Sequence, residues 1–453
     1  MAADRPESPK TPNHELSEMR CPVALEDVDL FGAGAQEHWY EAYEILHRES
    51  PVLRIPGEGM GPDSDAFVLA RYEDIARVVK DPARFPPLIT LAVDDIRPLI
   101  EKAIEDGGEP ELPPAVNAMI VSMASLRPTQ ELYRAHKREL TDPWVGPGAT
   151  RHEEMIRRTV DELIDGFIDR GRVEFVGEFA RPLPQIVMAR VLGFPLEDLP
   201  RLATWGTAMV RAFVFGKGHR NLLPRAELEA QAASLAEFGR YVKDQVVRKR
   251  RQPADDMTTF LTQVTYSPLR RKLRDTEIEG VVYAMVLGGL ETTQYALEEE
   301  AQLLCDDPAL FRTVRADRSK LRAFTEEAMR LRAPTQGLST RLTTRDEVFQ
   351  DVPVPAGSLL HIRFGAGNVD PAEYECPHRV RLDRKRLGGH LAFSQGPRTC
   401  PGAGISRVEQ TCAWNGLLDR IERLTYVPGN TFRHQPGIML GTLELHVEFD
   451  ASR

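Results

Sequence analysis

The sequence predicts a mostly α-helical protein with a small β-rich part. Apolar residues recur with helical spacing along most of the 453 residues, and in segment 275–304 the helical pattern extends over about thirty positions. Period-two alternation, broken by prolines and glycines, is confined to residues 51–72, 335–371 and 432–449. These observations favour a large helical body that carries a few short strands.

Composition narrows the class of protein. Apolar residues make up 42% of the chain and charged residues 28%, as in ordinary globular proteins with a large core. The net charge of −10 argues against a nucleic-acid binder, and the densest basic cluster, at 248–251, ends a predicted helix where cations complement the helix dipole. The five cysteines show no pair spacing, which indicates a reducing compartment. Without a long apolar run or a signal-like start, we expect a cytoplasmic protein with no membrane span.

Taken in order, the chain begins with a polar, proline-containing tail over residues 1–20, which we expect to be disordered. Helical spacing then predicts helices over 37–50, 71–85, 128–140, 155–171 and 226–251, with a hairpin over 51–72. Residues 86–126 are apolar and interrupted by prolines. They are interpreted equally well as short core helices or as a loop that covers a ligand pocket.

The stretch 389–409, GHLAFSQGPRTCPGAGISRVE, carries the strongest chemical signal. Cys400 precedes a helix-permissive run, with Pro401 as a favourable first helical residue, so we expect the helix dipole to lower the pKa of its thiol. Gly396 allows a tight turn that brings backbone amides towards the sulfur. Arg398 is placed to reach a carboxylate beside a metal, and the apolar ring of the preceding phenylalanine, Phe393, would exclude water.

The pattern Phe-x-x-Gly-x-Arg-x-Cys-x-Gly, from Phe393 to Gly402, resembles the haem-binding signature of the cytochrome P450 family of haem-thiolate monooxygenases. A lone cysteine before a helix would be interpreted as a buried structural residue, but five matching positions favour the haem site. The resemblance implies haem b as cofactor and Cys400 as the axial thiolate ligand of its iron. Residues implied to lie around the cofactor are Phe393, Gly396, Arg398 and Gly402.

Segment 275–304 is the second informative stretch. Thr276 and Glu279 form a Thr-x-x-Glu pattern that predicts a capping box at the start of the long helix. Gly288 and Gly289 fall in its middle, where each costs about 1 kcal/mol relative to Ala. Such a cost indicates a specific reason, and the close approach of a flat cofactor is one.

Thr292 stands one turn after Gly288, where its hydroxyl can bond to a carbonyl of the preceding turn or serve a ligand. Gly-Gly-x-Glu-Thr-Thr resembles the acid–alcohol signature of the same family. The resemblance implies that Thr292 assists the activation of O2 and that Glu291 relays protons from solvent, a role that suits a partly buried carboxylate with a raised pKa. The helical phase places Ala284, Leu287 and Gly288 near the substrate pocket.

The resemblance also implies residues that support the site. Glu327 and Arg330, on a helix, would join Arg379 in a buried triad that holds the proximal loop. Arg341 is a candidate ligand of a haem propionate. Where bacterial relatives carry a His-x-x-x-Arg pair this chain has Leu132 and His136, so His136 either donates to a propionate or belongs to an exposed proximal face.

The resemblance covers roughly residues 25–453 and implies the cytochrome P450 fold over a single domain, 21–453, with a small β-rich subdomain. The haem would be buried between the long central helix and the proximal loop that contains Cys400. Residues 205–224, which include Phe213, would form a roof over the pocket, and the segment that contains Leu338 would touch substrate. The terminal stretch 432–449 is expected to form a hairpin whose tip reaches the same pocket.

The leading functional hypothesis is a bacterial-type monooxygenase that oxidises a small-to-medium hydrophobic substrate by hydroxylation, O-demethylation or epoxidation. No second module follows the haem motif, so electrons from NAD(P)H would arrive through a separate ferredoxin or flavodoxin with its reductase. Cations expected on its docking face are Lys137, Arg138, Arg384, Lys385, Arg386 and Arg407. The alternatives are a peroxide-driven peroxygenase, which the presence of Glu291 and Thr292 disfavours, and a haem-thiolate sensor.

Overall fold

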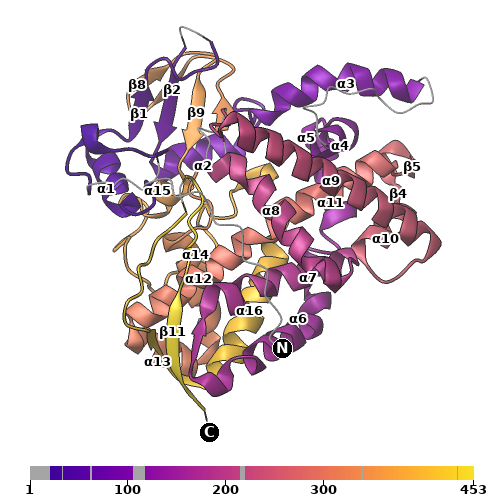
Figure 1. The fold of residues 1–453 in the computed structure, drawn as a ribbon. Coiled ribbons are helices and arrows are strands. Elements are labelled where there is room, and N and C mark those ends of the chain that lie inside the picture. Colours follow the sequence, from indigo (N-terminus) through magenta and orange to yellow (C-terminus); the bar gives the residue numbers. More distant parts are fainter. Residues whose placement is uncertain are drawn as a thin grey trace.

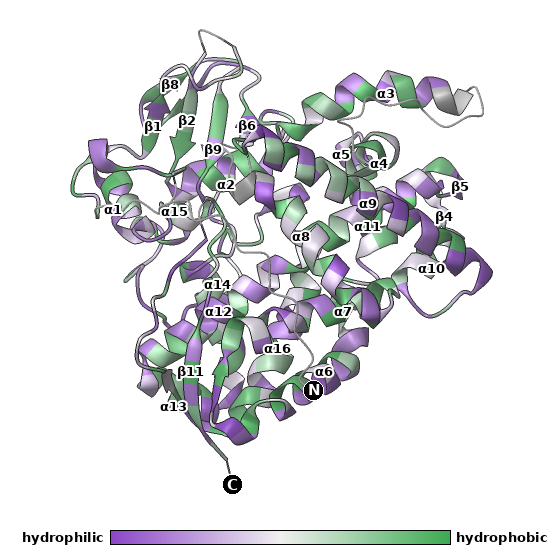
Figure 2. Cartoon of the chain, viewed as in Figure 1, coloured by the Kyte–Doolittle hydropathy of each residue, from purple (hydrophilic) through white to green (hydrophobic). Residues whose placement is uncertain are grey.

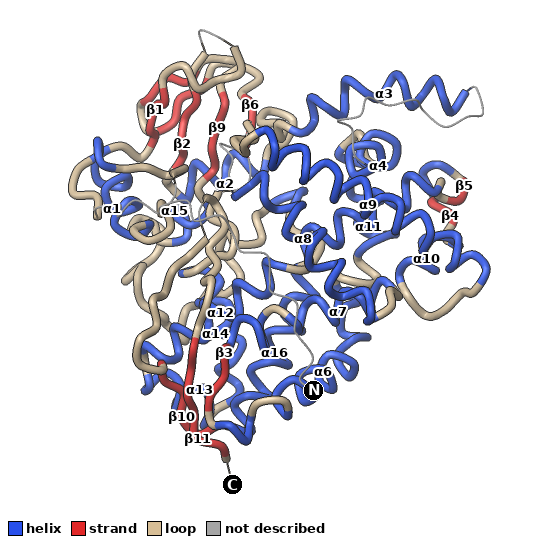
Figure 3. Tube along the Cα trace, in the orientation of Figure 1, coloured by secondary structure: helices blue, strands red, loops and turns tan. Residues whose placement is uncertain are grey.

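The structure is a computed structural model that describes residues 21–32, 34–61, 64–105, 118–214, 220–337, 340–435 and 437–452. Helices form the body of the molecule, and most of the described strands belong to a four-stranded and a three-stranded sheet at separate edges of it (Figures 1 and 3). The mostly α-helical prediction is therefore confirmed. The tail predicted over residues 1–20 lies outside the described residues.

The first sheet joins segments that are far apart in the sequence. Its strand order is β1-β2-β9-β6, in which β2 runs parallel to β9 and the other neighbours are antiparallel. Strands β2 and β9 are buried along their whole length, and Figure 2 shows them as predominantly hydrophobic. The strands are β1 (Val52–Ile55), β2 (Ala66–Leu69), β6 (Thr340–Leu342) and β9 (Leu359–Ile362).

The hairpin predicted over 51–72 is β1 and β2, and two helices flank it at the sheet, α1 (Trp39–Glu49) and α2 (Tyr72–Lys80). Residues 335–371 form the predicted short strands and turns, but they end in a helical turn, α15 (Phe364–Asn368). Two further hairpins pair β4 (Thr265–Tyr266) with β5 (Arg271–Lys272) and β7 (Glu347–Phe349) with β8 (Val352–Val354).

The central helix of the body is α11 (Asp275–Gly289), which contacts α4, α7, α8 and α9. None of the helices in the described part of the chain is both long enough and apolar enough to cross a membrane. The surrounding helices are α4 (Ala118–Leu126), α5 (Gln130–His136), α6 (Glu153–Asp165), α7 (Pro182–Leu192), α8 (Leu199–Val214), α9 (Arg225–Arg251), α10 (Met257–Gln263), α13 (Pro308–Ala316), α14 (Leu321–Leu331) and α16 (Ala403–Arg420).

The segment predicted as one long helix is two helices. Helix α11 ends at Gly289, and α12 (Glu291–Asp306) begins after a break at Leu290. The hydroxyl of Thr292 donates to the Gly288 carbonyl at 2.7 Å, and such back-bonding competes with the backbone ladder and bends helices. The break therefore falls beside the acid–alcohol pair.

The capping box predicted from Thr276 and Glu279 is wrong. The N-cap is Arg274, two residues before Thr276, and the helix begins at Asp275. Glu277 supplies the reciprocal contact, because its carboxylate accepts the Arg274 N–H at 2.8 Å. The same carboxylate forms an ion pair with Arg271 at 2.7 Å, a contact from outside the helix that the local pattern did not indicate.

Residues 86–126 contain two helices, α3 (Ile89–Glu105) and α4, with residues 106–117 outside the described part. Apolar side chains of the two helices, among them Val93, Ile96 and Val121, form one buried cluster. Helix α4 also packs closely against α11. The described residues therefore agree with the interpretation as core helices. The alternative, a loop that covers a ligand pocket, stays a prediction.

The terminal hairpin predicted over 432–449 is only partly present. Backbone bonds join Gln435 to Gly441 and Leu443 to Arg433, which makes a short turn over 433–443. The strand β11 (His446–Ala451) pairs instead with β10 (Ile421–Tyr426) and β3 (Arg172–Glu174). The local alternation could not distinguish between these partners, because one of them lies more than 250 residues away.

Candidate active site

The Cys400 loop approaches helix α16 in a tightly constrained path. The Cys400 N–H donates to the Phe393 carbonyl at 2.9 Å, which closes the turn over the intervening residues. Gly396 adopts φ +72°, and a Cβ there would lie 2.9 Å from the Lys80 Cα on α2. Both the left-handed backbone and the close approach require glycine at this position. Helix α16 starts at Ala403, two residues later than the expected start at Pro401.

The electrostatic environment of Cys400 contains opposing effects. Burial is the largest, and it raises the pKa of the thiol above its ordinary value. Backbone amides of Gly402 and Ala403 and the cations Lys137 and Arg407 act in the opposite direction. The lowering that we expected from the start of the helix is therefore present but outweighed by burial, and a bound metal ion is the charge that would deprotonate such a thiol.

A buried carboxylate that sequence reasoning did not single out supports this loop. Glu326 on α14 accepts hydrogen bonds from Arg407 at 2.5 and 3.0 Å and lies 2.9 Å from His390 Nε2. The Arg407 guanidinium in turn lies over the Phe393 ring, 4.6 Å from its centroid. Burial would raise the pKa of Glu326, but hydrogen bonds from His390 and Arg407 lower it to about 2. The only sequence signal was its position next to Glu327.

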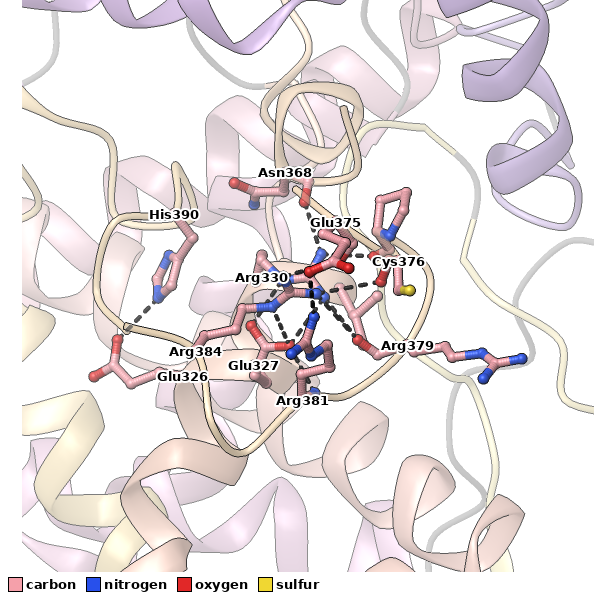
Figure 4. A network of polar contacts seen from close by, with 12 residues as sticks. Glu326, Glu327, Arg330, Asn368, Glu375, Cys376, Arg379, Arg381, Arg384 and His390 are labelled. Atoms are coloured by element: carbon pink, nitrogen blue, oxygen red, sulfur yellow. Dashed lines mark hydrogen bonds and ion pairs between the residues drawn. The ribbon is translucent and has the colours of Figure 1, made fainter. Parts of the chain in front are cut away.

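The predicted triad around Glu327 is formed by a different third arginine. Arg330 pairs with Glu327 at 2.8 Å, and both side chains are almost fully buried. The Arg379 side chain points away from the pair in Figure 4, and only its carbonyl accepts from Arg330, at 3.0 Å. Arg384 takes the expected place, because its Nε donates to Glu327 at 2.8 Å. The Arg379 assignment is therefore wrong.

The two mid-helix glycines of α11 have different surroundings. A Cβ on Gly289 would lie 2.9 Å from Met188 on α7, so this glycine permits helix packing. A Cβ on Gly288 would meet no atom within 4 Å. Ala284 and Leu287, which share the face of Gly288, are only partly buried, unlike most of this core helix. This face of α11 is therefore open enough for a flat group to lie against it.

The carboxylate of the acid–alcohol pair is held inside the protein. Glu291 accepts a hydrogen bond from the Tyr295 hydroxyl at 2.5 Å and a weaker one from Thr207 at 3.4 Å. Burial raises its pKa, although both hydrogen bonds oppose the shift. A carboxyl group that stays protonated at higher pH than usual is suited to donate a proton. Neither Tyr295 nor Thr207 was indicated by the sequence pattern.

Three arginines and a histidine near the Cys400 loop have buried polar atoms that make no hydrogen bond to another described residue. The Nε atoms of Arg127, Arg341 and Arg398 and both ring nitrogens of His136 are buried and have no hydrogen-bond partner within the described part of the chain. Burial, together with the neighbouring Arg398, lowers the pKa of Arg341 to about 10. Burial and the charge of Arg127 hold the pKa of His136 well below its usual value. Buried donors ordinarily have partners, so this set fits an anionic cofactor.

A pocket beside two of these residues, Arg127 and His136, reaches the Cys400 loop at Pro401. It lies between α5, α11 and the residue after the cysteine, and it is lined by Arg127, Tyr133, His136, Lys137, Thr141, Val281, Ala284, Met285 and Pro401. The buried His136 contradicts its interpretation as part of an exposed face. Arg127 was not predicted, because it precedes the helix on which the usual propionate pair was sought. Haem, with two carboxylates, fits the orphaned donors, the open Gly288 face and the thiol.

Two predicted pocket residues are not placed. Leu338 lies outside the described residues, and Phe213 belongs to α8 but its side chain is not described. The segment predicted as a roof over the pocket is helical up to Val214 and again from Arg225. Residues 215–219 between these helices lie outside the described part.

Comparisons with known proteins agree with this geometry. Residues 214–447 match the family model described as cytochrome P450. The chain is 28% identical over 387 residues to cytochrome P450 107B1 of Saccharopolyspora erythraea, covering 83% of this chain and 86% of that protein. It is also 28% identical to the cyclomarin C epoxidase CymV of Salinispora arenicola, covering 84% and 90% of the two chains.

Solved structures show the same fold. The open form of cytochrome P450 EryK from S. erythraea superimposes with a TM-score of 0.75 at 25% identity, over 94% of this chain and 98% of that one. A P450BioI complex with an acyl carrier protein gives a TM-score of 0.74 at 22% identity, over 92% and 99%. With the family model spanning more than half of its length, the chain belongs to the cytochrome P450 family of haem-thiolate monooxygenases.

Proposed function

We propose that the protein inserts one atom of O2 into a small-to-medium hydrophobic organic substrate, by hydroxylation, O-demethylation or epoxidation. Electrons originate from NAD(P)H and arrive through a separate ferredoxin or flavodoxin. The observation that carries this proposal is the pairing of Thr292 with a buried, hydrogen-bonded Glu291 beside the open Gly288 face. A peroxide-driven enzyme or a sensor has no need of such a proton-supplying pair.

The residues that would hold haem are Cys400, through its sulfur, and a set with unused polar groups that would bind the two carboxylates: Arg127, His136, Arg341 and Arg398. When bound, haem supplies the redox chemistry that activates O2, and a thiolate ligand favours cleavage of the O–O bond. The Phe393 ring, held under the Arg407 guanidinium, is the apolar group that would limit access of water to the sulfur. Gly402 adjoins the sulfur, and a Cβ there would make an ordinary van der Waals contact with it at 3.9 Å.

The protein's own part in the reaction is the delivery of protons. Burial raises the pKa of the Glu291 carboxyl, which stands next to Thr292 in the chain, and this favours its protonated form. The Thr292 hydroxyl donates to the Gly288 carbonyl and keeps its lone pairs available as acceptors. A hydroxyl in this position can accept a proton from the acid side and present its own proton to the pocket.

A hydrophobic substrate is supported by the apolar, partly buried face of Ala284 and Leu287 on α11. Among the relatives, CymV is named as an epoxidase of cyclomarin C, and an EryK structure contains erythromycin B. A CYP109E1 structure contains testosterone. These names guide the choice of compounds for a first screen and do not indicate a single substrate.

The test is turnover with a surrogate ferredoxin, its reductase and NADPH. Candidate terpenoids, steroids and macrolides are first ranked by the spin-state change that they cause in the ferric protein. Product that carries oxygen from isotopically labelled O2 is expected for the best ligands. Turnover with peroxide alone, and none with O2 and the electron-transfer chain, would instead establish the peroxygenase.

A further inference from the structure

Three side chains with metal-binding groups meet beside the first turn of α1, which lies at an edge of the molecule (Figure 1). The Cys21 sulfur, a ring nitrogen of His38 and a carboxylate oxygen of Glu41 all lie within 4.8 Å of one another. His38 is the N-cap of α1, and Glu41 stands three residues later in its first turn. Cys21 and Glu41 are exposed and His38 is partly exposed, so an ion can reach all three from solvent.

The segment that carries Cys21 is held in place by its own contacts. The Val23 and Ala24 N–H groups each donate to the Asp27 carboxylate at 3.0 Å, which fixes the backbone just after the cysteine. The short 3-10 helix that follows (Leu25–Asp27) packs against α1. The sulfur is therefore presented to the other two groups by a fixed backbone, and rotation of the side chains sets the separation between them.

The charge around these side chains favours a cation. Residues 21–49 contain seven acidic residues and one arginine, a formal charge of −6, while the whole chain carries −10. Burial would raise the pKa of Glu37, but His434 and, more weakly, His38 lower it. The Glu37 carboxylate is therefore within electrostatic reach of the His38 ring. A carboxylate close to a metal-bound histidine commonly orients the ring and raises its basicity.

The donor set identifies the class of cation. Mg²⁺ and Ca²⁺ take oxygen ligands, whereas Zn²⁺ accepts a thiolate, an imidazole and a carboxylate in one tetrahedral site. Bonds of about 2.3 Å to sulfur and about 2.0–2.2 Å to nitrogen and oxygen place tetrahedral ligands about 3.3–3.6 Å apart. The observed limit of 4.8 Å is therefore only about 1 Å wider than a closed site requires, a difference that rotation of exposed side chains covers.

The same place adjoins the turn over 433–443. Glu37, next to His38 in the chain, accepts the His434 N–H at 2.8 Å, and its carboxylate lies 3.2 Å from one ring nitrogen of His434. The other ring nitrogen of His434 lies 3.4 Å from Glu299 on α12. An ion that fixes His38 would therefore also steady the neighbouring residue that attaches this turn to α1.

We propose that Cys21, His38 and Glu41 form a Zn²⁺ site in which water is the fourth ligand. The Cys21 thiol gives up one proton to solvent as the sulfur–zinc bond forms, and no group is oxidised or reduced. The bound ion ties the segment around Cys21 to the start of α1. None of the three ligands belongs to the candidate active site, so this inference does not depend on the proposed function. Its competitor is a chance proximity of three surface groups.

The test uses the holoenzyme, without a histidine tag and with haem bound, after treatment with a chelator. Competition with a fluorescent zinc indicator is expected to show one strongly bound Zn²⁺ per chain. X-ray absorption at the zinc edge, which is separate from that of iron, should show one sulfur at about 2.3 Å. Cys21→Ser, His38→Gln and Glu41→Gln should each weaken binding at least about tenfold, because loss of a group that merely orients a ligand already costs about 10- to 100-fold.

The matched controls change the same chemical groups elsewhere. Cys376→Ser alters the other exposed cysteine, and Glu44→Gln removes a carboxylate of α1 that pairs with His378 at 3.3 Å. Both variants should bind Zn²⁺ as the native protein does. Unchanged affinity in Cys21→Ser and His38→Gln, or a zinc spectrum without sulfur, would overturn the site. Equal weakening in the controls would also overturn it, because the protein would then hold an adventitious ion only.

Discussion

At the scale of single residues, Cys400 and Thr292 show how burial and local hydrogen bonds set reactivity. Burial keeps the Cys400 thiol protonated, while the amides of Gly402 and Ala403 favour the thiolate. Thr292 is held by the Gly288 carbonyl at 2.7 Å, which fixes its hydroxyl beside the open face of α11. A second buried thiol, Cys412, and the hydroxyl of Thr293 are chemically similar to these two groups and serve as controls.

The first prediction concerns the iron ligand. Cys400→Ser is expected to abolish the thiolate signature in the CO-difference spectrum, because a serine hydroxyl does not replace the electron-donating thiolate. Cys412 is a buried thiol within α16, and Cys412→Ser should keep the signature. Retention of the signature in Cys400→Ser would show that another residue binds the iron.

A second prediction concerns proton supply. Thr292→Ala should retain haem and substrate binding but divert reducing equivalents to peroxide. A positioned proton donor contributes typically 100- to 10,000-fold, so product formation is expected to fall within that range. The control is Thr293→Ala, because the Thr293 hydroxyl donates to Ser406 on α16 and not into the pocket. Product and peroxide are measured against NADPH consumed, and an unchanged ratio in Thr292→Ala contradicts the role.

At the scale of elements, two buried carboxylates on α14 organise the long loop that leads to Cys400. Glu327 binds Arg330 on its own helix and Arg384 from the loop, while the adjacent Glu326 binds Arg407 on α16. Figure 4 shows the loop wrapped around these side chains. The loop has little regular secondary structure, so these contacts and backbone turns determine its path.

A third prediction distinguishes the two arginines of this loop. Arg384→Ala should lower the free energy of unfolding by about 1–3 kcal/mol, because a hydrogen bond to a buried charged group is lost. Arg379→Ala should have little effect, since only the backbone carbonyl of Arg379 takes part. Urea unfolding of both variants, with haem content as a second readout, provides the measurement. If the two changes lower the free energy of unfolding equally, the Arg379 side chain also contributes to the contacts around Glu327.

The turn over 433–443 gives a pH-dependent prediction. The folded pKa of His434, about 9, lies above its ordinary value of 6.5, so its ion pairs stabilise the protein fully below pH 6.5 and are lost as the pH rises through 9. The shift corresponds to at most about 3 kcal/mol. Urea unfolding at pH 6.5 and pH 9.5 should show the loss in the native protein and a smaller one in His434→Gln. An identical pH dependence in both would exclude this ion pair as its cause.

At the scale of the whole molecule, the cations expected on the docking face divide into two groups. Arg384 and Arg407 are bound to Glu327 and Glu326, and Lys137 donates to the Thr399 carbonyl at 3.0 Å, so these three support the Cys400 loop. Lys385 and Arg386 are exposed, and so is Arg138. Reversing a member of the first group would damage the fold, and only the second group offers a clean test of docking.

The last prediction therefore uses Lys385→Glu with Arg386→Glu. The reversal should slow electron transfer from an acidic ferredoxin at low salt and leave substrate affinity unchanged. The difference should shrink with salt, because the Debye length falls from about 10 Å at 0.1 M to about 3 Å at 1 M. Arg225→Glu, at an exposed position on α9, is the matched control. A reduction rate indifferent to both reversal and salt would place the docking face elsewhere.

The sequence by itself determined the helical class, the Cys400 motif and the Glu291–Thr292 pair, while the burial of Glu327 with Arg330 was expected only from the family resemblance. The first three depend on residue types at short, fixed spacings, which chemistry constrains locally. The identity of the third arginine, the cap at Glu277, the partner strands of β11 and the donors Arg127 and Tyr295 were decided by tertiary structure. In each case the partner comes from a distant segment or from a competing nearby side chain. Only the folded chain shows which of the possible contacts forms.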